Sequence, residues 1–499
     1  MKDGTRRTPH AGEFKRSRVL VDLGGREASP RLDLSLQPAD DRAIEDSIRR
    51  LSRNNLSFQP RLRKALPLNR PPESQVRAEL PGRRDVLPEQ RNMAARKRTV
   101  TPLFLAAALV AASGSHVEAR PSPQPAPAAT PVARIPFELN GHVIFLPVAV
   151  NGSPPGSFVL DTGAQGSSLN TRTASALRLP LGRGGTAHGA GGNIASHRLS
   201  GVTLGVGEAR LEKLDLSAME LAPLENNTGR AIDGILGSDL FRRYVVEIDY
   251  ETKRIRLYEP SGFDAEGRGA SLPLRFEHQH PYVRAAVTLP GWGVLDGEFV
   301  LDLGSNLALI LLPSFIEEKK LRDSLPPTIE TFGRGVGGEV GLPIGRASRL
   351  RVGAHALEAP VTAFPRSGTF GRTGKAGNIG SAVLRRFRVT FDYSRSRMFL
   401  EPNARFGDPF EFDMSGLQLV TESPAFDVVR VNRVLPNSPA AEAGLRPADE
   451  ILSVAGRPAT AMRLAELREM LRQPDREYPL QIKRGAETLS VSLKTRRLL

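Results

Sequence analysis

The chain has 499 residues and no Cys, so it is long enough for about three domains, while disulfides, thiol catalysis and Cys-ligated zinc are excluded. The chain contains 69 basic residues (Lys and Arg) and 54 acidic residues (Asp and Glu). Residues 1–98 contain 23 basic and 13 acidic residues, so the rest of the chain has 46 basic and 41 acidic residues. Most of the net charge of +15 therefore lies in the N-terminal region. That near-balance, with only 6 Tyr and 1 Trp available for base stacking, argues against a nucleic-acid partner.

The N-terminal region changes character at Met93. Residues 1–92 are rich in Arg and Pro without a sustained hydrophobic period, which predicts a disordered segment or a spurious upstream extension. Residues 93–119 combine the basic patch 96–98, the apolar run 102–112 and small residues suited to cleavage, as in a secretory signal peptide. A buried core helix is the alternative. The run is shorter than the ~20 residues of a stable membrane anchor. We therefore expect only transient membrane contact and a mature chain that is periplasmic or secreted from a bacterial cell.

After a Pro-rich linker at 120–133, short apolar and β-branched runs separated by Gly, Asn and Pro predict strands. These runs contain a duplication in three blocks that keep the same order. The spacing is 141 residues for the first block, from Asp161 to Asp302, and 143 for the other two. The blocks are Phe158–Asp161 with Gly163 against Phe299–Asp302 with Gly304, Gly234–Ser238 against Gly377–Ser381, and Asp249-Tyr250 against Asp392-Tyr393. The duplication predicts two β half-units, residues 134–261 and 270–402.

The repeated carboxylates, Asp161 and Asp302, each follow three apolar residues and should stand at the end of a buried strand. A single Asp-x-Gly fits an ordinary turn equally well. The duplication, however, lets the two carboxyls meet about a pseudo-twofold axis, where they would share one proton and titrate as a pair. One could then accept a proton from water while the other donates to a scissile carbonyl.

These motifs resemble those of retroviral-type aspartic proteases of the pepsin–retropepsin clan. Phe158–Ser167, reading FVLDTGAQGS, is similar to the active-site loop, and Ile235-Leu236-Gly237 is similar to the second signature of that clan. The likeness covers about residues 134–402 and implies a mainly β fold with two pseudo-twofold-related retropepsin-like barrel halves in one chain. It implies an aspartic-type endopeptidase without cofactor or metal, in which Asp161 and Asp302 are catalytic. The same resemblance implies roles for Thr162, whose hydroxyl would brace the two loops, and for Gly163 and Gly304, which would let backbone approach the dyad.

The second copy departs from this pattern at two positions. Leu303 stands where the family has Thr, so Thr162 lacks a mirrored partner, and a buried unpaired hydroxyl costs about 1–3 kcal/mol unless water or backbone takes it. Asn378 replaces the first apolar residue of the second signature, whereas Ser305 fits the family preference for a hydroxyl. The second half is therefore the weaker match.

Each copy also has a Gly-rich segment between its Asp loop and its second signature, at residues 186–193 and 333–339. Glycine at this density suits mobile flaps that cover an extended peptide, and ordinary hairpin loops are an equal alternative. His188 and His197 lack a nearby carboxylate cluster, so we predict no metal site. The predicted flap residues are His188, Gly189, Gly191 and Gly192 in the first copy and Gly335, Gly337 and Gly338 in the second.

The C-terminal residues 412–496 resemble a PDZ domain of the bacterial protease-associated type. The likeness rests on Gly416-Leu417-Gln418-Leu419, Ser438–Leu445 and Asp449–Leu452. It implies a small α+β domain that binds extended or C-terminal peptides as an added strand, with N–H groups near Gly416, Leu417, Gln418 and Leu419 holding a terminal carboxylate. Leucines at helical spacing, Leu464, Leu467 and Leu471, fit a core face, and Leu464 is also a candidate for the peptide groove.

Together these features predict a secreted or periplasmic aspartic endopeptidase whose partners are peptide or protein substrates and PDZ-bound peptide termini. Two alternatives stay open. One is a peptide-binding protein that has lost turnover through Leu303, and the other is an adaptor in which only the PDZ domain is functional.

Overall fold

The computed structural model describes residues 17–21, 32–36, 130–366, 374–422 and 424–499. The chain divides into two units, residues 1–117 and residues 118–499. In the first unit, β1 (Ser17–Val21) pairs antiparallel with β2 (Leu32–Leu36). In the segment predicted to lack a core, the described residues 17–21 and 32–36 thus form a strand pair, built from two short runs rich in Leu and Val. Most of that predicted extension and the whole predicted signal peptide lie outside the described residues.

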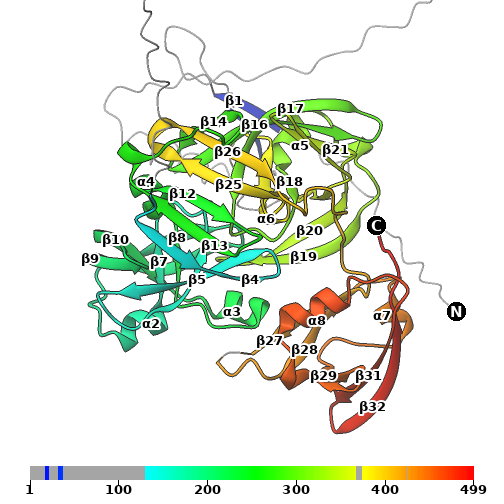
Figure 1. The fold of residues 1–499 in the computed structure, drawn as a ribbon. Coiled ribbons are helices and arrows are strands. Elements are labelled where there is room, and N and C mark those ends of the chain that lie inside the picture. The colour runs from blue at the N-terminus through cyan, green and yellow to red at the C-terminus, as the bar shows by residue number, and fades with distance from the viewer. Residues whose placement is uncertain (1–16, 22–31, 37–129, 367–373, 423) are drawn as a thin grey trace, which may run out of the picture. The chain divides into compact units, whose positions relative to one another are not determined.

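The first half-unit is a β-sheet in the order β4-β5-β6-β11-β7-β10-β9-β8, and a further pairing of β5 with β9 closes it into a barrel (Figure 1). At its centre β6 and β11 run parallel, and the buried Phe158-Val159-Leu160 and Gly234-Ile235-Leu236 have the apolar continuity of strands covered on both faces. The elements are β4 (Glu138–Asn140), β5 (Val143–Val150), β6 (Gly156–Leu160), β7 (Ser168–Asn170), α2 (Thr171–Ala176), β8 (Gly184–Gly189), β9 (Gly192–Val206), β10 (Ala209–Met219), α3 (Ala222–Thr228), β11 (Gly234–Leu236) and α4 (Ser238–Arg243).

The second half-unit repeats this plan with the order β19-β20-β23-β18-β24-β17-β16-β21-β22, and β15 pairs with β16. Its central parallel pair is β17 with β24, which corresponds to β6 with β11. The elements are β15 (Arg275–Glu277), β16 (His280–Leu289), β17 (Gly293–Asp302), β18 (Leu309–Leu311), α5 (Pro313–Glu318), β19 (Ile329–Gly335), β20 (Gly338–Arg346), β21 (Arg349–Val352), β22 (His355–Glu358), β23 (Val361–Ala363), β24 (Gly377–Gly380) and α6 (Ser381–Leu384).

A third sheet joins the halves through its central strands β12 and β25, which lie side by side (Figure 1). Val246 pairs with Phe391 and Ile248 pairs with Val389, so each residue faces the duplicate of the other's position, 143 residues along the chain. This register is what a twofold axis through the pair requires. The order is β14-β26-β25-β12-β13-β3, from β14 (Ser271–Pro273), β26 (Arg397–Pro402), β25 (Phe387–Asp392), β12 (Val245–Asp249), β13 (Arg254–Tyr258) and β3 (Ala133–Pro136).

Aromatic side chains from the two halves pack against one another beside this sheet. Phe241 of α4 meets Phe391 edge to face at 5.4 Å and stacks on Tyr393, also at 5.4 Å, so the first half packs directly on the second. One continuous apolar cluster spans both halves. The predicted mainly β fold with two related halves is confirmed. Single 3-10 turns follow the strands β13 and β25, namely η1 (Pro260–Gly262) and η3 (Tyr393–Arg395), and a further one, η2 (Arg322–Ser324), follows α5.

The C-terminal domain has its own core, which includes the buried Leu464, Leu467 and Leu471. Its sheet order is β27-β28-β29-β31-β32, with β30 paired to β29, and β27 is therefore an edge strand. The elements are β27 (Leu417–Thr421), β28 (Val429–Val434), α7 (Pro439–Glu442), β29 (Glu450–Val454), β30 (Arg457–Pro458), η4 (Ala459–Ala461), α8 (Leu464–Met470), β31 (Glu477–Arg484) and β32 (Glu487–Lys494). No helix in the described part of the chain combines the length and the apolar character needed to cross a membrane.

Candidate active site

Two loops at the ends of β6 and β17 bring Asp161 and Asp302 together: a Cβ placed on Gly163 would lie 2.9 Å from Asp302 Oδ1 and 3.0 Å from Asp161 Oδ1. In each half the strand before the Asp is held by its parallel neighbour. The Asp161 N–H donates to Leu236 O at 3.0 Å, and Asp302 pairs with Gly380 on β24. The duplicated strands thus place two half-buried acids against each other.

The glycines of these loops pack against the opposite carboxyl. A Cβ on Gly304 would lie 2.6 Å from Asp161 Cγ, and a Cβ on Gly163 would lie 2.9 Å from Asp302 Cγ. No side chain fits at either position without moving an acid. Each Asp also accepts a backbone hydrogen bond within its own loop, from Gly163 N to Asp161 Oδ1 at 2.7 Å and from Ser305 N to Asp302 Oδ1 at 3.0 Å.

Burial raises the pKa of the Asp161 carboxyl well above its ordinary value, and the charge of Asp302 raises it further. The backbone N–H groups of Gly163 and Gly304 act in the opposite direction but do not cancel the rise. Asp161 therefore keeps its proton through the acidic and neutral range.

The hydroxyl of Thr162 crosses from the first loop to the second. It donates to Leu301 O at 2.7 Å and accepts from Leu303 N at 3.0 Å. Thr162 and Leu303 are both fully buried, and Leu303 packs into the apolar core. The missing mirrored Thr therefore does not leave the Thr162 hydroxyl unpaired, because backbone of the second loop supplies both its partners.

Asn378, the polar residue in the second signature, lies beside the dyad. Its Nδ2 donates to Asp302 Oδ2 at 2.6 Å. At the equivalent place on β11 stands Ile235, an apolar side chain without a donor. Asn378 looked like a weakness of the second copy in the sequence, and the structure gives it a contact with the acid.

The two Gly-rich segments form hairpins, β8–β9 and β19–β20, whose tips touch. The Gly191 N–H donates to Val336 O at 2.9 Å, and a Cβ on Gly191 would lie only 2.1 Å from Gly338 O. Gly192, Gly337 and Gly338 adopt positive φ angles of 129°, 90° and 135°, which favour glycine. Gly189 pairs with Gly192 and Gly335 with Gly338 at the bases of the tips, while the His188 Nδ1 lies 2.7 Å from Asn193 Oδ1 on an exposed face.

A separate apolar cluster links these tips to the first dyad loop. Four of its partly buried members come from both hairpins and from the loop itself, namely Ala187, Ile194, Val336 and Ala164, and Leu224 comes from α3. Its buried members include Val159 and Ile235, from the two strands that flank Asp161, and the others are Val143, Phe145, Met219, Leu221 and Ile232. The tips are therefore held next to an apolar surface beside the acids.

Two histidines that no sequence motif marks connect the halves at the dyad loops. His142, before β5, lies with Nδ1 2.8 Å from Asn306 O in the second loop, and its N–H donates to Asn306 Oδ1 at 2.8 Å. His280, at the start of β16, lies with Nε2 2.9 Å from Gly163 O in the first loop. Burial lowers the pKa of His142 well below its ordinary value, so this ring is neutral. Single histidines carry no spacing signal, and only the fold brings them to the site.

In the PDZ region, Gly416 has a φ of 78° and donates its N–H to Asp413 Oδ2 at 2.5 Å. Leu417, Leu419 and Leu464 are buried in the domain core, whereas the Gln418 side chain donates to Phe332 O of β19 at 2.9 Å.

The predicted PDZ groove, between the edge strand β27 and α8, is lined by the segment 226–229 of the first half-unit. Thr421 Oγ1 donates to Asn226 O at 3.2 Å, and Arg468 Nη2 of α8 lies 3.4 Å from Asn227 Oδ1. Gly229 lies so close to Leu464 that a Cβ there would approach the Leu464 Cβ to 2.7 Å. Segment 226–229 therefore contacts both walls of the groove.

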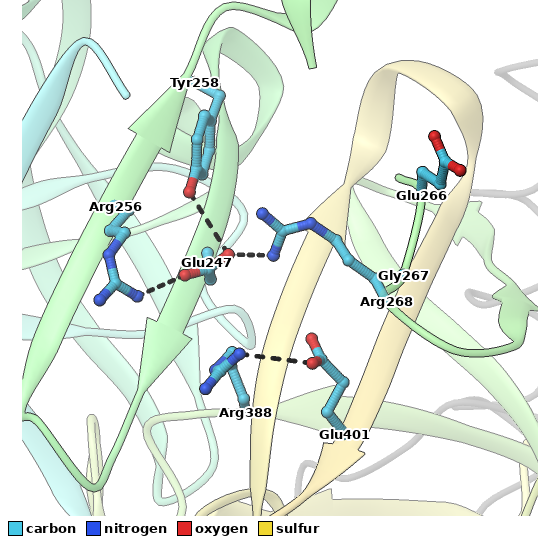
Figure 2. Close-up of a pocket in the computed structure, with 8 residues that line it drawn as sticks. All are labelled: Glu247, Arg256, Tyr258, Glu266, Gly267, Arg268, Arg388 and Glu401. Atoms are coloured by element: carbon cyan, nitrogen blue, oxygen red, sulfur yellow. Dashed lines mark hydrogen bonds and ion pairs between the residues drawn. The ribbon is translucent and has the colours of Figure 1, made fainter. Parts of the chain in front are cut away.

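A recess of about 380 Å³ lies on the sheet that joins the halves (Figure 2). Glu247, only 3% exposed, forms ion pairs with Arg256 at 2.5 Å and with Arg268, while Arg388 lies 3.4 Å from Glu401. The positive and negative side chains that line the recess neutralise one another's charge, and neither dyad loop contributes to its lining. The recess is lined by Glu247, Arg256, Tyr258, Glu266, Gly267, Arg268, Arg388 and Glu401.

Comparison with known protein families identifies two parts of this architecture. Residues 146–240 match the family model of aspartyl proteases, a stretch that includes Asp161 and the first copy of the second signature. Residues 430–484 match the model of the PDZ domain. No curated protein matches the chain. The chain thus carries an aspartyl protease domain and a PDZ domain, and the predicted combination is confirmed.

Proposed function

We propose that this chain is an aspartic endopeptidase that hydrolyses peptide bonds, with Asp161 and Asp302 as its catalytic pair. The observation that carries the proposal is that loops from both halves bring these two carboxyls together, each packed against the glycine of the opposite loop. A carboxyl that stays protonated beside one that is charged supplies a general acid and a general base at one point. Secretion to a bacterial periplasm or to the medium is part of the proposal and rests on residues 93–119 of the sequence.

In the proposed reaction, the charged carboxylate takes a proton from a water molecule, and the water oxygen bonds to the scissile carbonyl carbon. The protonated carboxyl gives its proton to the carbonyl oxygen, so a neutral gem-diol forms. One carboxyl then gives a proton to the amide nitrogen as the carbon–nitrogen bond breaks, and the other takes a proton from a gem-diol hydroxyl. A free acid and a free amine are left, and the pair again holds one proton. Water is the nucleophile, and the proposal requires no cofactor.

The touching hairpins support a role as flaps that cover the substrate. Hairpin tips that close over the acids would exclude bulk water, and the apolar cluster at Val159, Ile235 and Val336 favours apolar substrate side chains beside the bond that is cut. An extended peptide requires the tips to part and close again.

We expect Gly191→Ala to lower kcat/KM for peptide cleavage by about 10–100-fold, because its Cβ would overlap Gly338 and keep the tips from closing. The matched control is Gly341→Ala on β20 of the opposite hairpin, where a Cβ meets no atom within 4 Å. Steady-state cleavage of a fluorogenic peptide measures both. Equal values for the two variants would contradict a covering role for the tips.

The PDZ domain supports peptide binding, and we propose that it takes peptide C-termini along β27. Segment 226–229 lies against the groove, so a peptide must displace it. We expect Thr421→Val, which removes the bond to Asn226 O, to raise peptide affinity by about 2–10-fold. Fluorescence anisotropy of a labelled peptide measures this, with the C-terminally amidated peptide as control. Unchanged or weaker binding in the variant would show that the segment does not compete.

The proposed activity is tested by incubating the full chain with an unfolded protein from acidic to neutral pH and identifying new termini by mass spectrometry. Cleavage that requires both acids supports the endopeptidase. Peptide binding without cleavage at any pH would favour the binding-protein alternative. Binding that depends on the PDZ domain alone would favour the adaptor.

A further inference from the structure

The duplication gives the dyad two flanking positions that are equivalent in the fold but different in chemistry. Ile235 pairs with Val159 on the first dyad strand, and Asn378 pairs with Val300 on the second. Both lie between a Gly and an apolar residue, and both are buried, at 6% and 7% exposed. Only the position beside Asp302 carries a hydrogen-bond donor.

Asp302 therefore accepts hydrogen bonds on both of its oxygens. Ser305 N donates to Oδ1 at 3.0 Å, and Asn378 Nδ2 donates to Oδ2 at 2.6 Å. A donor directed at a carboxylate oxygen stabilises the charged form of that acid over the protonated form. The Asn378 amide thus favours the negative charge on Asp302 over the negative charge on Asp161, a difference that a symmetric pair of acids would lack.

The orientation of the amide agrees with this preference. Asn378 Oδ1 is buried and has no hydrogen-bond partner among the described residues, so its donor end alone is engaged. The reversed amide would set two acceptors against each other whenever Asp302 is charged. Ile235 on the other side can neither donate nor accept.

We propose that Asn378 is a positioning residue that fixes the negative charge on Asp302 and the shared proton on Asp161. This proposal rests on the proposed endopeptidase function. Asp302 is then the base that takes the proton of the water, and Asp161 is the acid that protonates the scissile carbonyl oxygen. The raised pKa of Asp161, which comes from burial and from its neighbour Asp302, agrees with this assignment.

Other ionisable groups surround the pair and are common to the wild-type chain and its variants, so a change at position 378 isolates the amide. Four of them contact the dyad loops or act electrostatically on Asp161, namely His142, Asp239, His280 and Tyr393.

The test compares wild type with Asn378→Ile, which copies the first half, using protein labelled with ¹³C at the Asp carboxyl carbons. NMR titration follows both acids, with assignments from Asp161→Asn and Asp302→Asn. We expect the lower apparent pKa of the pair to rise by about one unit, a tenfold change in proton affinity, because the charged form loses a donor. The acidic limb of kcat/KM should move to higher pH by the same amount. Ile379→Val, a change in the fully buried core residue next to Asn378 on β24, is the matched control and should leave both unchanged.

Reciprocal exchange sharpens the assignment. In the double variant Ile235→Asn with Asn378→Ile, the donor faces Asp161, and we expect the resonance that changes most in the upper titration step to switch from Asp161 to Asp302. If Asn378→Ile does not fold, Asn378→Ala removes the amide without added bulk. An unchanged lower pKa in a folded variant at position 378 would overturn the proposal. The titration needs no turnover, so a dyad that titrates as a pair without cleaving peptides would refute the proposed function and still decide the role of Asn378.

Discussion

Asp161→Asn and Asp302→Asn each lower cleavage of an unfolded protein by about 10²–10⁴-fold, the range expected when a general acid or base is lost. Each variant removes one of the two carboxyls that the loops bring together, and the remaining one cannot act as acid and base in the same step. The measurement is the rate of appearance of new peptide termini at several pH values. Cleavage that survives either change would exclude a shared-dyad mechanism.

The control for this result is Asp296→Asn, an exposed acid on the same strand as Asp302. It should keep wild-type activity. Stability separates lost chemistry from a lost fold. The pKa of Asp161 is higher in the folded chain than in the unfolded chain. Between these two pKa values the unfolded chain binds fewer protons, so the free energy of unfolding falls as the pH rises. Asp161→Asn removes that loss of stability, so its melting temperature should exceed that of wild type increasingly from acidic to neutral pH.

The sequence predicted those parts of the fold that a motif or an internal repeat indicates. Two copies of an apolar run ending in Asp predicted two buried strands whose ends meet, and β6 and β17 have this arrangement. The repeat also predicted that the halves meet about a pseudo-twofold axis. The register of Val246 with Phe391 was not predictable, because strand pairing depends on how two finished halves dock.

Other features of the site depend on contacts between residues that are distant in the chain. His142 and His280 reach the dyad loops from the opposite half, and neither has a neighbour in sequence that would indicate this. The apolar cluster beneath the hairpin tips likewise draws on several strands. Asn378 was visible as a departure from the pattern, but its bond to Asp302 follows only from the parallel pairing of β24 with β17.

Leu303 shows how a departure from a family pattern can mislead. From the sequence, its apolar side chain suggested a broken brace and a weakened enzyme. In the structure the surviving hydroxyl on Thr162 takes two backbone groups of the second loop, and Leu303 contributes apolar packing instead. The Thr162 hydroxyl is therefore the polar link between the two loops at a place where the family pattern predicts two such hydroxyls, and the stability of the loops depends more strongly on it.

Thr162→Val should accordingly destabilise the chain by about 2–5 kcal/mol, because Leu301 O and Leu303 N both lose a partner in the buried interior. The melting temperature should fall by roughly 5–15 °C. Thr162→Ser keeps the hydroxyl at nearly the same place and should lose far less, so the difference between the two variants measures the brace itself. If Val and Ser were equally stable, the loops would be held by packing around Leu303 alone, and the single hydroxyl would have no structural role.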